Sequence, residues 1–217
     1  MSKEIEKRFF KFDRLHIEKI LRDVGAVKKG TYLFKVVQFN AHPPIKTLRV
    51  RDEGFRVTFT MKETTDDYDI ENEVVVSNFS EMRTMLTKLG YTEKYYMEKL
   101  REIYGIGESE LIVDHCPGLP GYIEIEAPTE EKLNELIETF GLDPRETVRN
   151  FSSVYKELYQ TGVDDLGYLH ISFGNLAETV KPLVQTNMDL FEQTVEDQKK
   201  IMESVTPTNP SRRSCPA

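Results

Sequence analysis

Eight segments of this sequence alternate apolar residues with polar or charged ones, and this alternation constrains the fold more than any other feature. A period of two places the apolar side chains on one face of a β-strand and the remaining side chains on the other. Breaks such as AHPP, DEG and PGLPG separate the segments and indicate turns. The expected strands lie near residues 3–10, 31–39, 46–51, 55–62, 69–76, 94–104, 109–114 and 121–126.

Three further segments have the period of an amphipathic helix. Residues 17–24, 82–89 and 133–140 each place four apolar side chains at i, i+3, i+4 and i+7, and a glycine follows each one at once. The order is therefore strand, helix, four strands, helix, three strands, helix, which is typical of an α+β protein. We predict an eight-stranded antiparallel sheet that closes into a β-barrel, with the helices packed on its outside.

The composition excludes several classes of protein. Apolar residues make up 39% of the 217 residues and charged residues 30%, which is enough apolar material for a core. No run approaches the roughly 18 apolar residues that a membrane span needs, and the first residues contain no hydrophobic signal core. The formal net charge of −8 disfavours general binding to nucleic acids. We expect a cytoplasmic protein without membrane or nucleic-acid partners.

The chain divides into one domain and two C-terminal segments. A helical pattern after residue 141 extends the predicted domain to residues 1–160. Residues 161–205 are expected to form a helical extension whose apolar positions are sparse, so it packs on a partner or lies loosely on the surface. If the partner is a second copy of the chain, the protein is a homodimer. Residues 206–217, TPTNPSRRSCPA, are expected to be a disordered tail.

The polar faces of the predicted strands carry paired charges that are sorted by sign. Two side chains at i and i+2 lie about 6.6–7 Å apart on one face, so two carboxylates there repel each other unless a cation lies between them. The first and eighth strands, which become neighbours if the sheet closes, are acidic, and the third, fourth and sixth are basic. The acids are Glu4, Glu6, Glu71, Glu73, Asp114, Glu124 and Glu126, and the bases are Arg8, Arg49, Arg51, Arg56, Lys62, Lys99 and Arg101.

This pattern has two interpretations. Carboxylates are the oxygen ligands that Mg²⁺ and Mn²⁺ prefer, and arginine and lysine bind phosphate oxygens, so the two groups together predict a site for a metal-bound polyphosphate. The alternative is a solvated sheet face on which the charges serve solubility. Because an unmatched buried charge is costly, the charged residues must be either exposed or matched by a ligand.

The order of these motifs resembles a known family. Glu4-Ile5-Glu6-Lys7-Arg8 resembles the ExExK signature of the CYTH superfamily, the triphosphate tunnel metalloenzymes, with arginine in place of the last lysine. Residues 114–128, DHCPGLPGYIEIEAP, resemble most closely the class IV adenylyl cyclase branch. The segment TYLFKVVQFN lacks an aspartate-containing element that many members carry. The remaining matches, in family order, are Leu48–Arg51, Thr60–Lys62, Glu71 with Glu73, Lys99 with Arg101, Asp114, and Glu124 with Glu126.

The resemblance implies an enzyme with a tunnel that binds a small-molecule triphosphate together with Mg²⁺ or Mn²⁺. The implied reaction is conversion of ATP to cyclic AMP and pyrophosphate. Hydrolysis of an inorganic, thiamine or nucleoside triphosphate is the alternative, and a non-catalytic polyphosphate-binding module is the second alternative. The implied metal ligands are Glu4, Glu6, Asp114, Glu124 and Glu126, with Glu73 as an additional candidate. The implied phosphate ligands are Arg8, Arg49, Arg51, Lys62, Lys99 and Arg101, with Arg56 in addition, and Glu6, Lys62 and Arg101 are expected to be catalytic.

Overall fold

The computed structural model describes residues 5–64, 69–145, 151–161 and 170–206. Eight strands form one antiparallel sheet in the order β1-β8-β7-β6-β2-β3-β4-β5, and a short β9 (His170–Ile171) pairs in parallel with β6. The eight strands are β1 (Ile5–Phe9), β2 (Val27–Phe39), β3 (Ile45–Asp52), β4 (Val57–Thr64), β5 (Asp69–Val76), β6 (Glu93–Ile106), β7 (Ser109–His115) and β8 (Tyr122–Ala127). The α+β class and the antiparallel pairing agree with the prediction.

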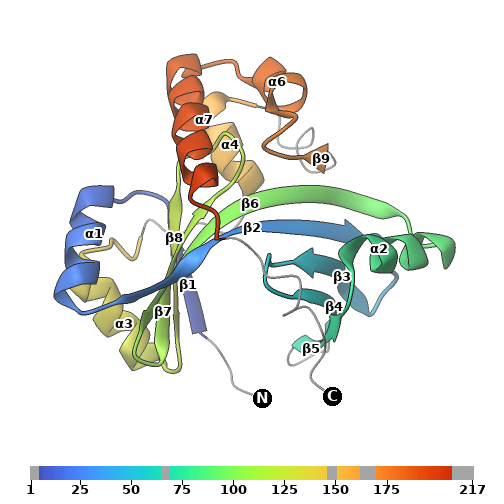
Figure 1. Cartoon of the computed structure of the whole chain (residues 1–217), viewed down its shortest axis with the longest axis horizontal. Helices are drawn as coiled ribbons and strands as arrows, with labels where there is room; N and C mark the ends of the chain where they lie inside the picture. The colour runs from blue at the N-terminus through green and yellow to red at the C-terminus, as the bar shows by residue number, and fades with distance from the viewer. Residues whose placement is uncertain (1–4, 65–68, 146–150, 162–169, 207–217) are drawn as a thin grey trace.

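Two long strands, β2 and β6, join two groups of shorter strands. β3 pairs with β2 along residues 35–38, whereas β7 pairs with β6 along residues 100–106, at the opposite end of the β2–β6 pair. We call β1, β7 and β8 the first wing, and β3, β4 and β5 the second wing. Figure 1 shows β2 and β6 arching across the molecule, with the first wing below one end and the second wing below the other.

The predicted closed barrel is not confirmed. In the described part of the chain, β1 pairs with β8 and β5 pairs with β4, and the hydrogen-bonded sheet ends at β1 and at β5. The predicted neighbourhood of the first and eighth strands is nevertheless present. Alternation determines which side chains share a face, but closure depends on strand order, tilt and stagger, which no local pattern encodes.

The three predicted helices are present, and local signals define both of their ends. They are α1 (Arg14–Asp23), α2 (Phe79–Lys88) and α3 (Glu130–Thr139), and the side chains of Asp13, Asn78 and Thr129 cap their N-termini by accepting backbone N–H groups. The glycine after each helix has a positive φ: 69° at Gly25, 96° at Gly90 and 62° at Gly141. Such a conformation stops a helix at low steric cost only when the residue lacks a Cβ.

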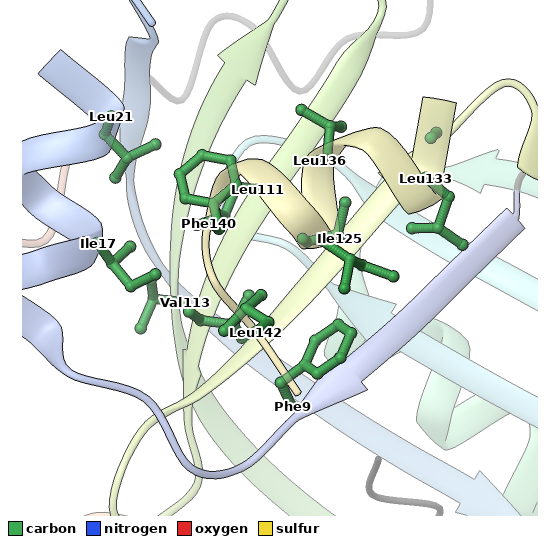
Figure 2. Packing of buried hydrophobic residues seen from close by; sticks show 13 residues of the cluster. Phe9, Ile17, Leu21, Leu111, Val113, Ile125, Leu133, Leu136, Phe140 and Leu142 are labelled. Atoms are coloured by element: carbon green, nitrogen blue, oxygen red, sulfur yellow. The ribbon is translucent and has the colours of Figure 1, made fainter. Parts of the chain in front are cut away.

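The apolar faces of the strands are covered by helices. One core lies between the first wing and helices α1 and α3, where Phe9, Val113 and Ile125 pack against Ile17 and Leu136 (Figure 2). A second core lies between the second wing and α2, around Val50 and Leu86. Each such side chain contributes about 1.5–3 kcal/mol when it is fully buried. Because these alternate residues point to the helices, their neighbours along each strand point to the other, polar face of the sheet.

The C-terminal segment packs firmly on the domain. Its described elements are α4 (Phe151–Tyr159), β9, α6 (Leu176–Thr179), a 3₁₀ turn (Lys181–Leu183) and α7 (Met188–Glu203). A third core joins them to the β7–β8 connection, and the predicted tail lies outside the described residues except for Thr206. None of the described helices combines the length and the apolar character that a membrane crossing requires.

Candidate active site

The strand register brings the predicted charged residues onto one face. Residues directly opposite each other in an antiparallel pair lie on the same face. Glu6 lies opposite Glu126, and Arg101 lies opposite Asp114. In the second wing, Arg49, Thr60 and Glu73 lie in one row across β3, β4 and β5. Glu4 lies outside the described residues, so its predicted role as a metal ligand stays a prediction.

Three carboxylates of the first wing form a cluster. Glu6, Glu124 and Glu126 each offer an oxygen, and these oxygens lie within 4.8 Å of one another. Burial, a hydrogen bond to Glu124 and repulsion by its charge raise the pKa of Glu6 to about 7. A carboxyl group that retains its proton near neutral pH indicates a shortage of positive charge. The donor set therefore suits a hard divalent cation such as Mg²⁺ or Mn²⁺.

Arg8 lies beside this carboxylate cluster on the same face. Its Nη2 is 2.7 Å from Glu6 Oε1, and its Nε is 3.3 Å from Glu124 Oε2. Burial alone would lower the pKa of the guanidinium, but the charge of Glu124 and its hydrogen bond raise it above the ordinary value. Arg8 is therefore held by the carboxylates and supplies part of the positive charge that they need.

Asp114 organises the basic residues of β6. Its carboxylate is fully buried, with 0% exposure, and lies 2.7 Å from Lys99 Nζ and 2.7 Å from both Nε and Nη2 of Arg101. The hydroxyl of Tyr122 also donates to it at 2.7 Å. Burial would raise the pKa of Asp114, but the charges of Arg101 and Lys99 outweigh burial and hold it below its ordinary value. Asp114 thus lies outside the cluster formed by Glu6, Glu124 and Glu126.

Of the two cations beside Asp114, Arg101 is well supplied with negative charge, because Asp114 and Glu124 raise its pKa, whereas Lys99 is not. Arg101 Nη2 also reaches Glu124 Oε2 at 3.1 Å, so Arg101 connects Asp114 with the carboxylate cluster. Both cations lie over the ring of Phe34, at 5.7 Å and 5.1 Å from its centroid. Burial and the charge of Arg101 lower the pKa of Lys99 in spite of Asp114. An anion bound next to Lys99 would restore the balance of charge there.

The second wing carries the other predicted phosphate ligands. Lys62 Nζ lies 2.6 Å from Glu71 Oε2, and Arg49 Nη2 lies 3.7 Å from Glu71 Oε1. Arg51 Nη2 lies 2.6 Å from Glu53 Oε1 and 3.5 Å from Glu73 Oε2. Arg56 pairs with Glu53 at 2.6 Å. The structure thus brings these basic residues together with acids of β5 and of the β3–β4 turn.

Two donors of the second wing have no hydrogen-bond partner among the described residues. The Nε atoms of Arg49 and Arg51 are buried and unpaired. Burial, and then the charge of Arg51, lower the pKa of Arg49. A buried charged donor left unpaired costs on the order of 1–3 kcal/mol or more, so these two groups favour an anionic acceptor.

Sequence reasoning missed three neighbours of the site. Tyr122 and Phe34 lie on the polar face, and the alternation could have identified both, because Tyr122 is two residues before Glu124. Glu53 lies in a turn, where no period applies, and only the structure brings its carboxylate to Arg51. Phe34 and Glu53 contact predicted phosphate ligands, and Tyr122 contacts Asp114, a predicted metal ligand.

Comparison with known proteins identifies the family. The CYTH domain model matches residues 3–160, and the chain therefore belongs to the CYTH domain family. The fold is similar to that of PH1012 from Pyrococcus horikoshii OT3, with 21% identity, a TM-score of 0.59, and coverage of 69% of this chain and 96% of that one. It is also similar to a protein from Vibrio parahaemolyticus titled "putative adenylate cyclase", with 17% identity, a TM-score of 0.57, and coverage of 71% and 95%. No curated protein matches the sequence.

Proposed function

We propose that this protein is a divalent-metal-dependent enzyme that acts on a triphosphate, with cyclisation of ATP to cyclic AMP and pyrophosphate as its reaction. One observation carries the proposal. The same face of the sheet presents a cluster of three carboxylates and, on β3, two arginines whose buried Nε donors lack partners in the described part of the chain. Membership of the CYTH family supports the same substrate class. A solvated face would not leave guanidinium donors buried and unpaired.

The carboxylates are assigned to the metal. Glu6, Glu124 and Glu126 would hold Mg²⁺ or Mn²⁺, and Glu4, which lies outside the described residues, is assigned to the same ion. The bound ion would neutralise phosphate charge as a Lewis acid. Asp114, which the resemblance implies to be a ligand, is assigned instead to holding Lys99 and Arg101, because its carboxylate is already occupied by both cations and by Tyr122.

The basic residues are assigned to the phosphates. Arg49, Arg51 and Lys62 would bind one part of the triphosphate, and Lys99 and Arg101 another. Phosphoryl and nucleotidyl transfer need mainly positioning and charge neutralisation, which fixed cations supply without reorganisation. Arg101 and Lys62 would stabilise charge that develops on the phosphate oxygens. Glu6, which the resemblance implies to be catalytic, would act by holding the ion, because a carboxylate that coordinates a cation must give up its proton.

Two reactions fit this arrangement. In a cyclase, the ribose 3′-oxygen attacks the α-phosphorus and pyrophosphate leaves. The similarity of residues 114–128 to class IV cyclases favours this reaction. In a hydrolase, water attacks the terminal phosphorus. One observation keeps the hydrolase as a second candidate: the polar face of β2 presents Tyr32, Phe34, Val36 and Gln38, none of which is charged, so this strand supplies no ionic group to orient a nucleoside.

The test incubates the full chain with ATP or tripolyphosphate, in Mg²⁺ or Mn²⁺, and separates the products by chromatography. Cyclic AMP with pyrophosphate is the expected result, and orthophosphate would assign the hydrolase. Glu6→Gln should abolish metal-dependent turnover while the far-UV circular dichroism stays unchanged, and the matched surface change Glu138→Gln should leave turnover intact. Binding without turnover would indicate the non-catalytic module, and absence of binding to both compounds would contradict the proposal.

A further inference from the structure

Gln198 of α7 binds the connection between β7 and β8. Its side-chain amide is buried, with 3% of the residue exposed. The Nε2 donates to the carbonyl oxygen of Cys116 at 2.7 Å and to that of Leu119 at 2.8 Å. The Oε1 accepts the backbone N–H of Gly118 at 2.8 Å. One side chain therefore forms hydrogen bonds with three backbone groups of a turn that lies about 80 residues earlier in the sequence.

Two tyrosines of α4 complete the attachment of this turn. The hydroxyl of Tyr155 donates to the carbonyl of Pro117 at 2.6 Å, and that of Tyr159 donates to the carbonyl of Gly118 at 2.7 Å. Four consecutive carbonyls, those of residues 116–119, thus accept hydrogen bonds from side chains of α4 and α7. A buried network whose members are all satisfied makes a segment rigid.

Close packing against α7 also holds the same turn. Gly118 has φ 76°, and a Cβ at this position would lie 2.5 Å from the ring of Phe191 on α7. Only glycine therefore fits between the turn and the helix without a shift of either. The contact leaves the turn little freedom to move relative to α7.

The turn joins Asp114 and Tyr122, which hold the basic residues of β6 in place. Asp114 ends the polar row of β7, Tyr122 begins β8, and the two lie opposite each other with a 2.7 Å hydrogen bond between their side chains. Asp114 in turn holds Lys99 and Arg101. A change in the turn would displace Tyr122 relative to Asp114, and the displacement would reach the two cations through bonds of 2.7 Å.

We propose that Gln198 is a positioning residue for the triphosphate site, and that α7, which lies beyond the segment matched by the family, is a functional part of that site. The functional part of this inference rests on the proposed binding of a triphosphate. Gln198 acts through the turn and through the Tyr122–Asp114 pair on Lys99 and Arg101. Removal of its hydrogen bonds should weaken tripolyphosphate binding by about tenfold or more, as losses of outer-shell partners commonly do.

The test replaces Gln198 by methionine, which has a similar length and cannot make the three hydrogen bonds. Val180→Ala is the matched control, because Val180 belongs to the same core but makes no side-chain hydrogen bond to the turn. The NMR signal of the Arg101 Nε–H, which donates to Asp114, reports the site geometry without any ligand. Calorimetry with tripolyphosphate and Mn²⁺ reports affinity, and thermal melting reports stability.

We expect Gln198→Met to move the Arg101 signal and to lower affinity at least about tenfold, whereas Val180→Ala lowers only the melting temperature. An unmoved signal, an unchanged affinity, or equal effects of Val180→Ala would overturn the inference. If the natural protein binds no tripolyphosphate, the proposed function fails, and the Arg101 signal alone still decides whether Gln198 positions these groups. Should Gln198→Met not fold, Tyr159→Phe, which removes one hydrogen bond to the turn and keeps the ring, decides by the same readouts.

Discussion

Replacing Asp114 by asparagine removes the negative charge that faces the buried cations of β6. The carboxylate accepts one hydrogen bond from Lys99, two from Arg101 and one from Tyr122, all at 2.7 Å. Asparagine keeps one oxygen acceptor, but its NH₂ group faces donors. Lys99 and Arg101 would then stay buried, with side chains only 17% and 11% exposed, and would lack their shared counter-charge.

The expected cost follows from this geometry. Breaking a buried ion pair by removing one partner costs about 3–5 kcal/mol, because the remaining charge is neither solvated nor paired. With a urea dependence of about 2–3 kcal/mol per molar, the midpoint of unfolding should fall by about 1–2.5 M. Since the pKa of Asp114 is lowered in the folded state, its stabilisation is present above the unfolded pKa of about 3.9 and is lost as pH falls through the folded pKa.

Urea denaturation followed by circular dichroism measures this cost. The difference between the natural protein and Asp114→Asn should stay constant from neutral pH down to about pH 5 and shrink below about pH 4. Asp143→Asn is the matched control, because Asp143 also pairs with an arginine, at 2.6 Å, but on the surface. If Asp114→Asn shifts the midpoint no more than this control does, the reasoning about the buried group is refuted.

Three further predictions concern the metal, the phosphates and the turn. Affinity for Mn²⁺ should rise with pH up to about 7 and then level off, because the pKa of Glu6 is raised to about 7 and the ion must displace the proton of this carboxyl group. A calorimetric affinity that does not change with pH would contradict this prediction. Arg51→Gln should weaken tripolyphosphate binding about tenfold to a hundredfold, whereas Lys199→Gln on the surface of α7 should not, and equal effects would count against the assignment. Gly118→Ala should destabilise the protein by about 1–3 kcal/mol more than Gly107→Ala in thermal melts. Both glycines have a positive φ, but of the two only Gly118 lies against an aromatic ring. Equal melting temperatures of the two variants would exclude that contact.

The faces of the strands could be predicted from the sequence. Ile123 and Ile125 of β8 lie in the core, and Glu124 between them lies on the polar face beside Arg8, as the alternation indicates. The pairing of the first and eighth strands was predicted as a consequence of closure. This pairing is present although the described sheet is open, with edges at β1 and β5. Because β2 pairs with β6, the order of the strands in the sheet differs from their order in the chain.

The partners of the site residues could not be predicted in the same way. The sequence places Asp114 on the polar face, but only the structure shows that its carboxylate holds Lys99 and Arg101. Glu102, one residue after Arg101, faces away from the site and binds Arg14 at 2.7 Å and Lys28 at 3.0 Å. The sequence pattern indicates that Glu102 points to the opposite face, but not which cations of α1 and β2 meet it there.

From its order of residues alone, this chain determines where helices begin and end, and which side chains of each strand share a face. Both properties repeat every two to four residues, so they are local. Which strands are neighbours, and which distant groups complete the site, depend on the packing of the whole chain. The amide of Gln198 reaches Gly118 only because α7 folds back onto the β7–β8 turn, and no short period in a sequence can encode a contact over that separation.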